Sequence, residues 1–471
     1  MKANISKIIR LILLALPLWG MGNIAHAQKV YICKDGDYIT KDISEGLEID
    51  LADQPDSITF TKPKIDPVVN IVYNGTTATV SIPMFLTDTV TCSSGTSSNV
   101  VLTYTGTEQE IIYNVSGSSS AGSLVIKSDY KQTVKLNGVS LTSTLGEAMR
   151  FKCGKRTELV MATGSVNTFA DTNDNGLTAD PTDNHKACIY TKGHLEISGA
   201  GTLNVTGNYN HAIATKEYVK VKKTVNEINI LGSVGDAIHA GQYFQINGGT
   251  INIDKGTLGD GIQAEFKTDD LGAIITDDEE NTGEVIINGG TINAIASATQ
   301  DTKCMKADGN ITINSGTLQL DAIARGSRGI QTDGSIAINQ DEDATTSITI
   351  TAQGAKCNLE EDEDDPHKCM GINVDGDINI TGGDINITAS GTSANGMKAD
   401  NDINVSGGTI TVAATGTSTN GMKIGNNATF TGGTTTVTST GSKSVGIVYS
   451  GTRTVGTGAT VNASWTYKKK N

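Results

Sequence analysis

Aromatic residues and prolines are scarce in this 471-residue chain: aromatics make up 4% of it and there are seven prolines. Length alone would suggest two or three globular domains of about 100–200 residues each. The composition argues against that, because the chain carries 54 glycines and is rich in Thr, Asn and Ile. A shortage of large side chains favours a repetitive β architecture, in which each repeat buries a thin layer of branched aliphatic residues.

A long apolar run is also missing. Leu11 to Leu18 follows three basic residues and precedes Ala25-His26-Ala27, which is the pattern of a bacterial secretory signal with its cleavage site. The run is too short for a permanent membrane span, and no cysteine follows it to carry a lipid anchor. We therefore expect residues 1–27 to be a signal peptide cleaved near Ala27, and the mature protein to be secreted or periplasmic, with no membrane span.

Basic residues are in deficit. Removing Lys2, Lys7 and Arg10 with the signal leaves 33 of the 36 basic residues and all 51 acidic ones, a formal charge of −18. Such a surface repels nucleic acid and anionic membranes and makes cation binding plausible. Solubility is the more common use of excess acidic residues. The charge therefore argues against nucleic acid and anionic membranes as partners, but it does not by itself identify a cation site.

Cysteine is limited to seven residues, an odd number that leaves at least one unpaired. Export permits disulfides without requiring them. Cys357 and Cys369 bracket the acidic stretch 360–365 and are the expected pair if one forms.

What the chain does contain is an internal repeat. The segment from Lys303 to Leu318 matches the segment from Asn395 to Ile410 nearly position for position. Most steps between equivalent positions are 24 or 25 residues, and the two longer steps contain polar, acidic insertions. One apolar position per repeat forms a ladder that comprises Ile189, Ile213, Ile238, Ile262, Met305, Ile330, Ile372, Met397, Met422 and Ile447.

Two further apolar ladders alternate with polar residues, which is the period of a strand with one buried face. Between them lies a Gly-Gly or Ser-Gly pair, such as Gly382-Gly383 and Gly407-Gly408, suited to corners because glycine accepts positive φ. The pattern predicts an all-β right-handed parallel β-helix, a solenoid with three short strands per coil of about 25 residues.

The repeat sets the expected domain limits. Residues 28–95 contain irregular β-like pieces and are expected to form an N-terminal β cap or small β unit, because solenoid ends must be covered against edge pairing. Residues 96–465 are expected to form the β-helix, and residues 466–471 a basic C-terminal tail.

Several stretches carry a family resemblance: the ten residues from Val134, those from Gly193 to Ile213, and Gly259-Asp260-Gly261-Ile262-Gln263-Ala264-Glu265. Over roughly residues 65–450 the chain resembles the carbohydrate-binding right-handed β-helix family known from a clostridial cellulose- and pectin-binding protein. The resemblance implies a calcium-binding fold similar to that of polysaccharide lyases, which binds plant cell-wall polysaccharide rather than cleaving it. Residues 53–60 are similar to the leader region of exported Bacteroidetes proteins.

Two groups of residues are candidate calcium ligands. Asp171, Asn173 and Asn175 precede Gly176 in the opening pattern of a calcium loop, although the closing Glu is replaced by Thr182. A solvated Asn/Asp turn explains this stretch equally well. Asp236 and Asp260 share one offset on consecutive coils, where stacked like charges repel unless a cation or donor lies between them, and no lysine is evident nearby.

Aromatic and histidine side chains gather on the coils before residue 245. We expect carbohydrate to bind there, because sugars pack on aromatic faces while polar groups fix their orientation. The alternative is an aromatic stack that only stabilises a corner. The candidate carbohydrate-binding residues are Tyr190, His194, Tyr209, Tyr218, His239 and Tyr243.

Tryptophan is almost absent: only Trp465 remains after signal removal, which argues against a flat platform for crystalline cellulose. The chain also lacks the Arg-x-Pro-x-x-Arg of pectate lyases and the Gly-His-Gly of polygalacturonases. We therefore expect an exported, non-catalytic, calcium-assisted protein that binds plant cell-wall or acidic polysaccharide. The alternatives are a β-helix lyase acting on uronates and a structural or adhesive surface solenoid. The sequence leaves the oligomeric state open.

Overall fold

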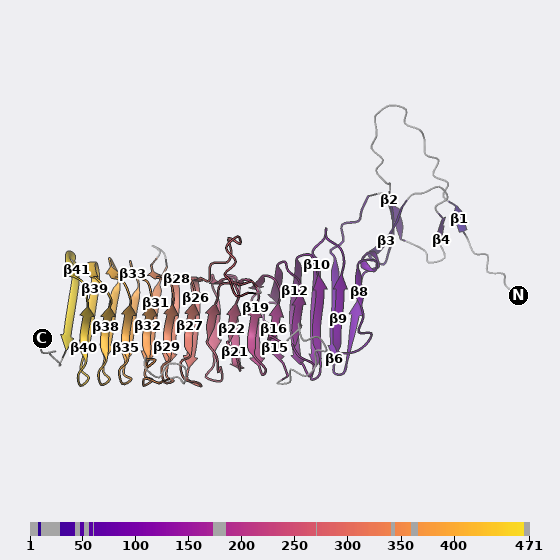
Figure 1. The fold of residues 1–471 in the computed structure, drawn as a ribbon. Helices are drawn as coiled ribbons and strands as arrows, with labels where there is room; N and C mark the ends of the chain where they lie inside the picture. Colours follow the sequence, from indigo (N-terminus) through magenta and orange to yellow (C-terminus); the bar gives the residue numbers. More distant parts are fainter. Residues whose placement is uncertain are drawn as a thin grey trace, which may run out of the picture.

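The computed structural model describes residues 8–10, 29–42, 48–50, 56–59, 61–172, 185–269, 271–340, 344–358 and 366–465. Over these residues the chain is all-β apart from one short 3₁₀ helix, η1 (Met84–Leu86), which confirms the expected class. Figure 1 shows the strands stacked in one long row. Within the described residues no helix is long and apolar enough to span a membrane. Most of the predicted signal peptide and all of the predicted basic tail lie outside the described residues.

One strand of each coil belongs to a 14-stranded sheet, which is parallel except at its first pair. Its members in chain order are β8 (Val90–Cys92), β9 (Asn99–Tyr104), β11 (Ser123–Ser128), β13 (Met149–Lys152), β16 (Ala187–Thr191), β19 (His211–Thr215), β22 (Ile238–Ala240), β25 (Ile262–Ala264), β27 (Lys303–Ala307), β29 (Arg328–Thr332), β32 (Met370–Val374), β35 (Asn395–Ala399), β38 (Asn420–Ile424) and β40 (Val445–Tyr449).

The rest of each coil belongs to a 22-stranded sheet that turns a corner between its two ladders. Its members in chain order are β6 (Val68–Asn74), β7 (Thr77–Ser81), β10 (Ile111–Ser119), β12 (Gln132–Thr142), β14 (Thr157–Met161), β15 (Val166–Ala170), β17 (Leu195–Ser198), β18 (Thr202–Gly207), β20 (Val219–Val221), β21 (Glu227–Ser233), β23 (Phe244–Ile246), β24 (Thr250–Ile253), β26 (Val285–Ala296), β28 (Ile311–Ala322), β30 (Ile336–Ile338), β31 (Thr346–Ala352), β33 (Ile378–Ile380), β34 (Asp384–Ala389), β36 (Ile403–Val405), β37 (Thr409–Ala414), β39 (Ala428–Ser439) and β41 (Arg453–Trp465).

The pairing register follows the apolar ladder read from the sequence. Ile238 pairs with Ile262, Ile372 with Met397, and Met397 with Met422. These side chains are fully buried, and they belong to one continuous core that runs the length of the coils. The chain is therefore a solenoid of parallel strands whose core is a column of aliphatic layers.

The corner between the second and third strands depends on glycine. Gly383, Gly408 and Gly433 all have positive φ, between 70° and 93°. A Cβ at Gly408 would lie 2.7 Å from the carbonyl oxygen of Gly383, and one at Gly433 would lie 2.5 Å from that of Gly408. Only glycine permits both this conformation and this approach of successive coils.

Outward-facing asparagines stack from coil to coil. The Asn229 amide donates to Asn204, Asn252 donates to Asn229 and Asn293 donates to Asn252, at 2.7–3.0 Å between N and O. These ladders let polar side chains satisfy one another on a repetitive surface. They explain why a solenoid can be rich in Asn without being unstable.

The N-terminal end differs from the coils. β6 pairs in parallel with β10 but antiparallel with β7, and β8 pairs antiparallel with β9. Before them lie an antiparallel sheet of β2 (Lys29–Lys34), β3 (Asp37–Asp42) and β5 (Ser57–Thr59), and the pair β1 (Ile8–Arg10) and β4 (Glu48–Asp50). Tyr38 of β3 stacks on Phe85 of η1 at 4.6 Å between ring centroids. Coil stacking thus already includes Val68–Asn74, upstream of residue 96.

The expected Cys357–Cys369 disulfide is wrong, because all seven cysteines are free. The Cys357 thiol donates to the carbonyl of Arg325, and the Cys369 thiol to that of Ala322. Each thiol thus has a backbone carbonyl as its partner, and the two sulfurs are not bonded to each other.

Candidate functional site

The outer face of the 14-stranded sheet carries two columns of side chains. One lies where the chain enters each strand, and it comprises His211, Asp236, Asp260, Lys303, Arg328, Met370 and Asn395. The other follows the buried ladder residue, and it comprises Tyr190, Ala214, His239, Gln263, Lys306, Gln331, Asn373, Lys398 and Lys423. Parallel stacking places functional groups along both columns at the spacing of neighbouring strands, about 4.8 Å.

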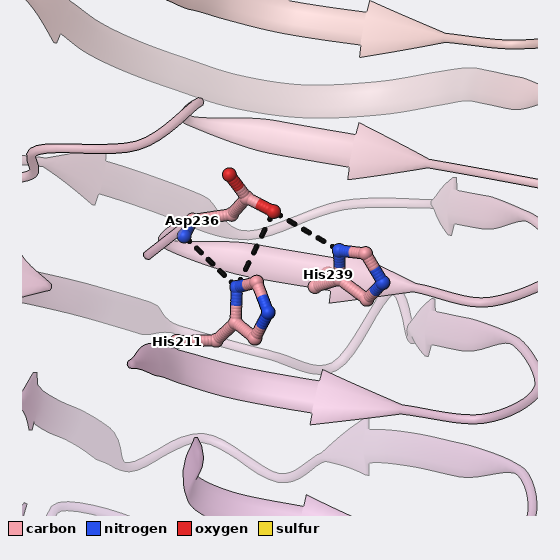
Figure 2. A group of neighbouring side chains, drawn as sticks. All are labelled: His211, Asp236 and His239. Carbon is pink, nitrogen blue, oxygen red and sulfur yellow. Dashed lines mark hydrogen bonds and ion pairs between the residues drawn. The ribbon is translucent and has the colours of Figure 1, made fainter. Parts of the chain in front are cut away.

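Three residues from these columns converge on one point. Figure 2 shows one oxygen of the Asp236 carboxylate joined by dashed lines to a ring nitrogen of His211 and to a ring nitrogen of His239. Its Oδ2 lies 3.0 Å from His239 Nδ1 and 3.3 Å from His211 Nδ1. The Asp236 backbone N–H also donates to His211 Nδ1 at 2.9 Å, and the two rings stack at 4.5 Å between centroids.

Burial and charge act in opposite directions on this cluster. Burial would raise the pKa of Asp236, but hydrogen bonds to His211 and His239 and their charges lower it well below its usual value. Burial would lower the pKa of His239, but the hydrogen bond and charge of Asp236 raise it, with help from Glu265 and Asp308. The cluster therefore favours an ionised carboxylate beside a protonated imidazole.

His211, Asp236 and His239 are a possible donor set for a metal ion, since one ligand atom from each residue lies within 4.8 Å of the other two. Two imidazole nitrogens and one carboxylate oxygen suit Zn²⁺ and similar transition ions. Calcium prefers six to eight oxygen ligands. The residues present thus fit the calcium implied by the family resemblance poorly, and fit a borderline divalent ion better.

The carboxylates of Asp236 and Asp260 accept hydrogen bonds from backbone N–H groups of the following coil. Asp236 Oδ1 accepts the Asp260 N–H at 2.8 Å, and Asp260 Oδ1 accepts the Lys303 N–H at 2.7 Å. Burial raises the pKa of Asp260 to about 6, with the Asp236 charge adding to the rise and Lys303 opposing it. The expectation that no lysine lies nearby was wrong for Asp260, because Lys303 follows on the next coil in space. One oxygen of each carboxylate therefore serves as a corner acceptor.

Asp171 is buried at the start of the insertion that follows β15. Its Oδ2 lies 2.8 Å from His185 Nε2, both side chains are almost fully buried, and its Oδ1 accepts the Asn208 N–H. This pairing gives Asp171 a structural role at the corner. The other two predicted ligands of that loop, Asn173 and Asn175, lie outside the described residues.

Three of the predicted sugar-binding residues form a stack at the corner before the second strand. Tyr218 lies between His194 and Tyr243, with centroid distances of 4.2 Å and 4.7 Å. The Tyr218 hydroxyl donates to Glu196, and His194 Nε2 lies 2.7 Å from Glu217. Both faces of Tyr218 are covered, so it has no face left for a sugar ring.

The other predicted aromatic residues do not join this stack. The Arg150 guanidinium lies over Tyr190 at 5.6 Å from the ring centroid, and Tyr209 stacks on His185 at 4.6 Å. His239 belongs to the Asp236 cluster. The six candidates are thus divided among several small groups.

Sequence reasoning missed His211 as the third member of the Asp236 cluster. The signal was available, because His211-Ala212-Ile213 and Asp236-Ala237-Ile238 occupy the same offset on consecutive coils. It also assigned His239 to sugar binding on its aromatic ring rather than on its neighbours. Residues at the same position of consecutive repeats become neighbours in a solenoid. Comparing the polar positions of the repeat, and not only the apolar ones, would therefore have predicted this contact.

Comparison with known proteins places the chain in a family. A family model described as carbohydrate-binding domain-containing protein matches residues 96–358, more than half of the chain. A carbohydrate-binding domain-containing protein of Acetivibrio thermocellus is 28% identical over 113 residues, which cover 23% of this chain and 39% of that protein. The match thus spans well under half of the relative's length.

Among solved structures, the polysaccharide lyase-like protein from C. thermocellum, in a gadolinium derivative, is similar at 22% identity and a TM-score of 0.45. The similarity covers 59% of this chain and 98% of the other. The family model extends over the coils that carry the His211–Asp236–His239 cluster and the aromatic stack. The chain belongs to the carbohydrate-binding domain-containing protein family.

Proposed function

We propose that this protein is an exported, secreted or periplasmic, non-catalytic module that binds polysaccharide of the plant cell wall or another acidic glycan along the outer face of its coils. The coils are proposed to form a right-handed β-helix, as the family resemblance implies. The observation that carries the proposal is the family match over residues 96–358, which includes most of the coils whose polar columns face outward.

The geometry of the outer face supports binding of an extended chain. The two columns offer amide, imidazole and ammonium groups at the spacing of neighbouring strands, and a polysaccharide lying along the coils would meet them in turn. A sugar hydroxyl can both donate and accept hydrogen bonds. The Gln, Asn and Lys residues of the second column supply both.

A divalent cation is part of the proposal. The sequence predicts Ca²⁺, whereas the donor set of His211, Asp236 and His239 fits Zn²⁺ better. When bound, such an ion would neutralise negative charge on the outer face and offer an open coordination position to a ligand oxygen. Calcium and zinc are therefore to be tested separately.

A glycan array with the purified mature protein, with and without chelator, tests the proposal. Binding to polysaccharide that weakens in chelator is the expected result, with binding restored by either Ca²⁺ or Zn²⁺. Unsaturated uronate products, detected by their ultraviolet absorbance after incubation with pectins, would contradict the non-catalytic assignment. Avid binding to cells or proteins without glycan binding would identify an adhesive solenoid instead.

A further inference from the structure

The insertion between β25 and β26 forms an arm, a name used here for the described residues 265–269 and 271–284. Figure 1 shows it as a loop that rises from the row of strands. Thr268 and Ile274 form an isolated antiparallel bridge, so the two halves of the arm pair with each other. The arm is thus a short hairpin that lies outside the coil repeat.

The base of the arm is fixed to the coils. Asn281 is buried, its Oδ1 accepts the Lys267 N–H at 2.6 Å, and its Nδ2 donates to the carbonyl of Lys267 at 2.9 Å. The same amide donates to the carbonyl of Ile275 at 2.7 Å. Gln242, on an earlier coil, donates to Asp278 at 2.6 Å. These bonds hold the arm in one direction relative to the sheet.

The turn at the tip of the arm exposes an apolar side chain. Asp269 Oδ1 accepts the N–H groups of Leu271 and Ala273, each at 2.9 Å, and Gly272 has a φ of 83°. Leu271 is 93% exposed and Ile274 is 50% exposed, whereas the other exposed large hydrophobic side chains of the described residues reach at most 58%. An ordered turn therefore holds a leucine almost wholly in water, which is a feature of interaction sites.

Acidic residues surround this apolar tip. The described residues of the arm include seven acidic residues and one basic residue. Glu280 lies 3.3 Å from His194, but the exposed Asp277 and Glu279 have no ion-pair partner among the described residues. A surface complementary to the arm would offer an apolar pocket with positive charge at its rim.

The chain itself has a cavity of this kind. It has a volume of about 270 Å³ and lies on the outer face of the 14-stranded sheet, over β29, β32, β35 and β38. A cavity of about 150 Å³ is enough for a benzene molecule, so this one has room for a leucine side chain with a carboxylate beside it. Its lining has no acidic residue and includes the apolar Pro366 and Met370 and the basic Arg328, Lys368, Lys398 and Lys423.

Positive charge at the cavity is only partly compensated. Arg328 lies 2.8 Å from Asp301, and Lys398 lies 2.8 Å from Asp400. Lys423 is exposed and has no ion-pair partner in the part of the chain that the structure describes. Lys398 and Lys423 are also paired in register on neighbouring strands, where like charges repel. An incoming carboxylate would relieve that repulsion.

We propose that the arm of one molecule docks in this cavity of a second copy of the chain. In this contact Leu271 packs on Pro366 and Met370. The carboxylates of the arm then face Lys398 and Lys423. Because arm and cavity are different surfaces, the contact is heterologous, and the assembly either closes into a ring or continues as a filament. This self-association goes beyond glycan binding and does not depend on it.

Sedimentation velocity over a wide range of protein concentration tests the contact. The arm variant Leu271→Gln removes the apolar tip, and the cavity variant Lys423→Glu reverses the unpaired charge. Val166→Gln is the control for the arm, because Val166 is the next most exposed of the large hydrophobic residues described. Lys127→Glu is the control for the cavity, because Lys127 is exposed on β11 of the same sheet. Circular dichroism and thermal melting establish that each variant is folded.

We expect the wild type and both controls to form oligomers as the concentration rises, and either test variant to weaken association at least tenfold. An equimolar mixture of the two test variants should form dimers and nothing larger, because each supplies the one surface that the other lacks. A wild type that stays monomeric, or association that both variants retain, overturns the proposal. Association lost in the arm variant but kept in the cavity variant overturns the cavity as the place where the arm binds.

Discussion

In the coils between residues 185 and 269 the outward side chains form stacked and ion-paired clusters of histidine, tyrosine and acidic residues, whereas the outward columns between residues 328 and 424 consist mainly of Arg, Asn, Gln and Lys. Asp236 contacts two histidines, and Tyr218 is stacked on both faces. Buried polar atoms without a hydrogen-bond partner among the described residues occur in both regions, for example Gln242 Oε1 and Thr257 Oγ1 in the first and Arg328 Nε and Asn395 Nδ2 in the second. The two regions thus differ in the chemistry of their columns rather than in how completely the polar atoms are paired.

The comparison shows that the side chains of an aromatic or charged cluster can contact one another and leave no group free for a ligand. Stacking brings like positions of successive coils about 4.8 Å apart, so neighbouring functional groups satisfy one another whenever their chemistry is complementary. Amide columns pair with themselves, as the Asn395 and Asn420 side chains do, whereas the like charges of stacked lysines repel one another.

The largest expected change in stability comes from removing the buried pair of Asp171 and His185. Asp171→Ala removes the partner of His185 and the acceptor for Asn208, and should lower the free energy of unfolding by about 3–5 kcal/mol, as for other broken buried pairs. Chemical denaturation followed by circular dichroism measures it. A loss below that of an exposed control such as Lys127→Gln would show that the early coils do not depend on this pairing.

Metal binding would sharpen the comparison next. At one hundred times its Kd, an ion that binds only the folded protein adds about 2.7 kcal/mol of stability. We expect Zn²⁺ to raise the melting temperature of the wild type and of His194→Ala, but not of His239→Ala. A rise with Ca²⁺ that survives His239→Ala would instead place the cation elsewhere.

The aromatic stack offers a third way to separate structure from binding. Tyr218→Leu loses two ring contacts, each worth about 0.5–1.5 kcal/mol beyond the buried area. We expect a destabilisation of about 1–3 kcal/mol in a denaturation series, with unchanged affinity for any glycan the wild type binds. A selective loss of glycan affinity without loss of stability would restore the stack as a sugar platform.

The smallest effect concerns a charged network on the 22-stranded sheet. Burial would raise the pKa of Glu158, but hydrogen bonds to Lys222 and Ser198 and the nearby charges of Lys222 and Arg156 lower it. Its stabilisation is therefore present above the unfolded pKa of about 4.5 and is lost as the pH falls through the lowered value.

Glu158→Gln should accordingly lower the melting temperature at pH 7, through a change of about 0.3–1 kcal/mol for such partly exposed pairs. The difference from the wild type should vanish once the pH has fallen below the lowered pKa of Glu158. A difference that is constant with pH would mean that Glu158 acts through packing rather than charge.

Much of the fold was predictable because one apolar position recurs once per coil, and aligning these positions gives the register in which neighbouring coils pair. Ile238, Ile262 and Met305 recur at one position per coil, and the structure pairs them as predicted. The glycine corners were equally legible, since Gly408 has the positive φ that the Gly-Gly pair indicated. What periodicity could not show was the merging of second and third strands into long ones such as β28, or the antiparallel pairings of β7 and β8 at the N-terminal end.

The candidate sites were predictable only in part. The sequence by itself determined which offsets are polar and which coils carry His, Tyr and Asp, because a repeat imposes the same position on every coil. Only the tertiary structure decided that Asp236 contacts two histidines and that Cys357 and Cys369 are not joined by a disulfide. It alone decided that Arg328, Asn373 and Asn395 leave buried atoms unpaired. The physical reason is that hydrogen bonding depends on side-chain direction at corners and on insertions such as residues 366–368, which a one-dimensional pattern does not contain.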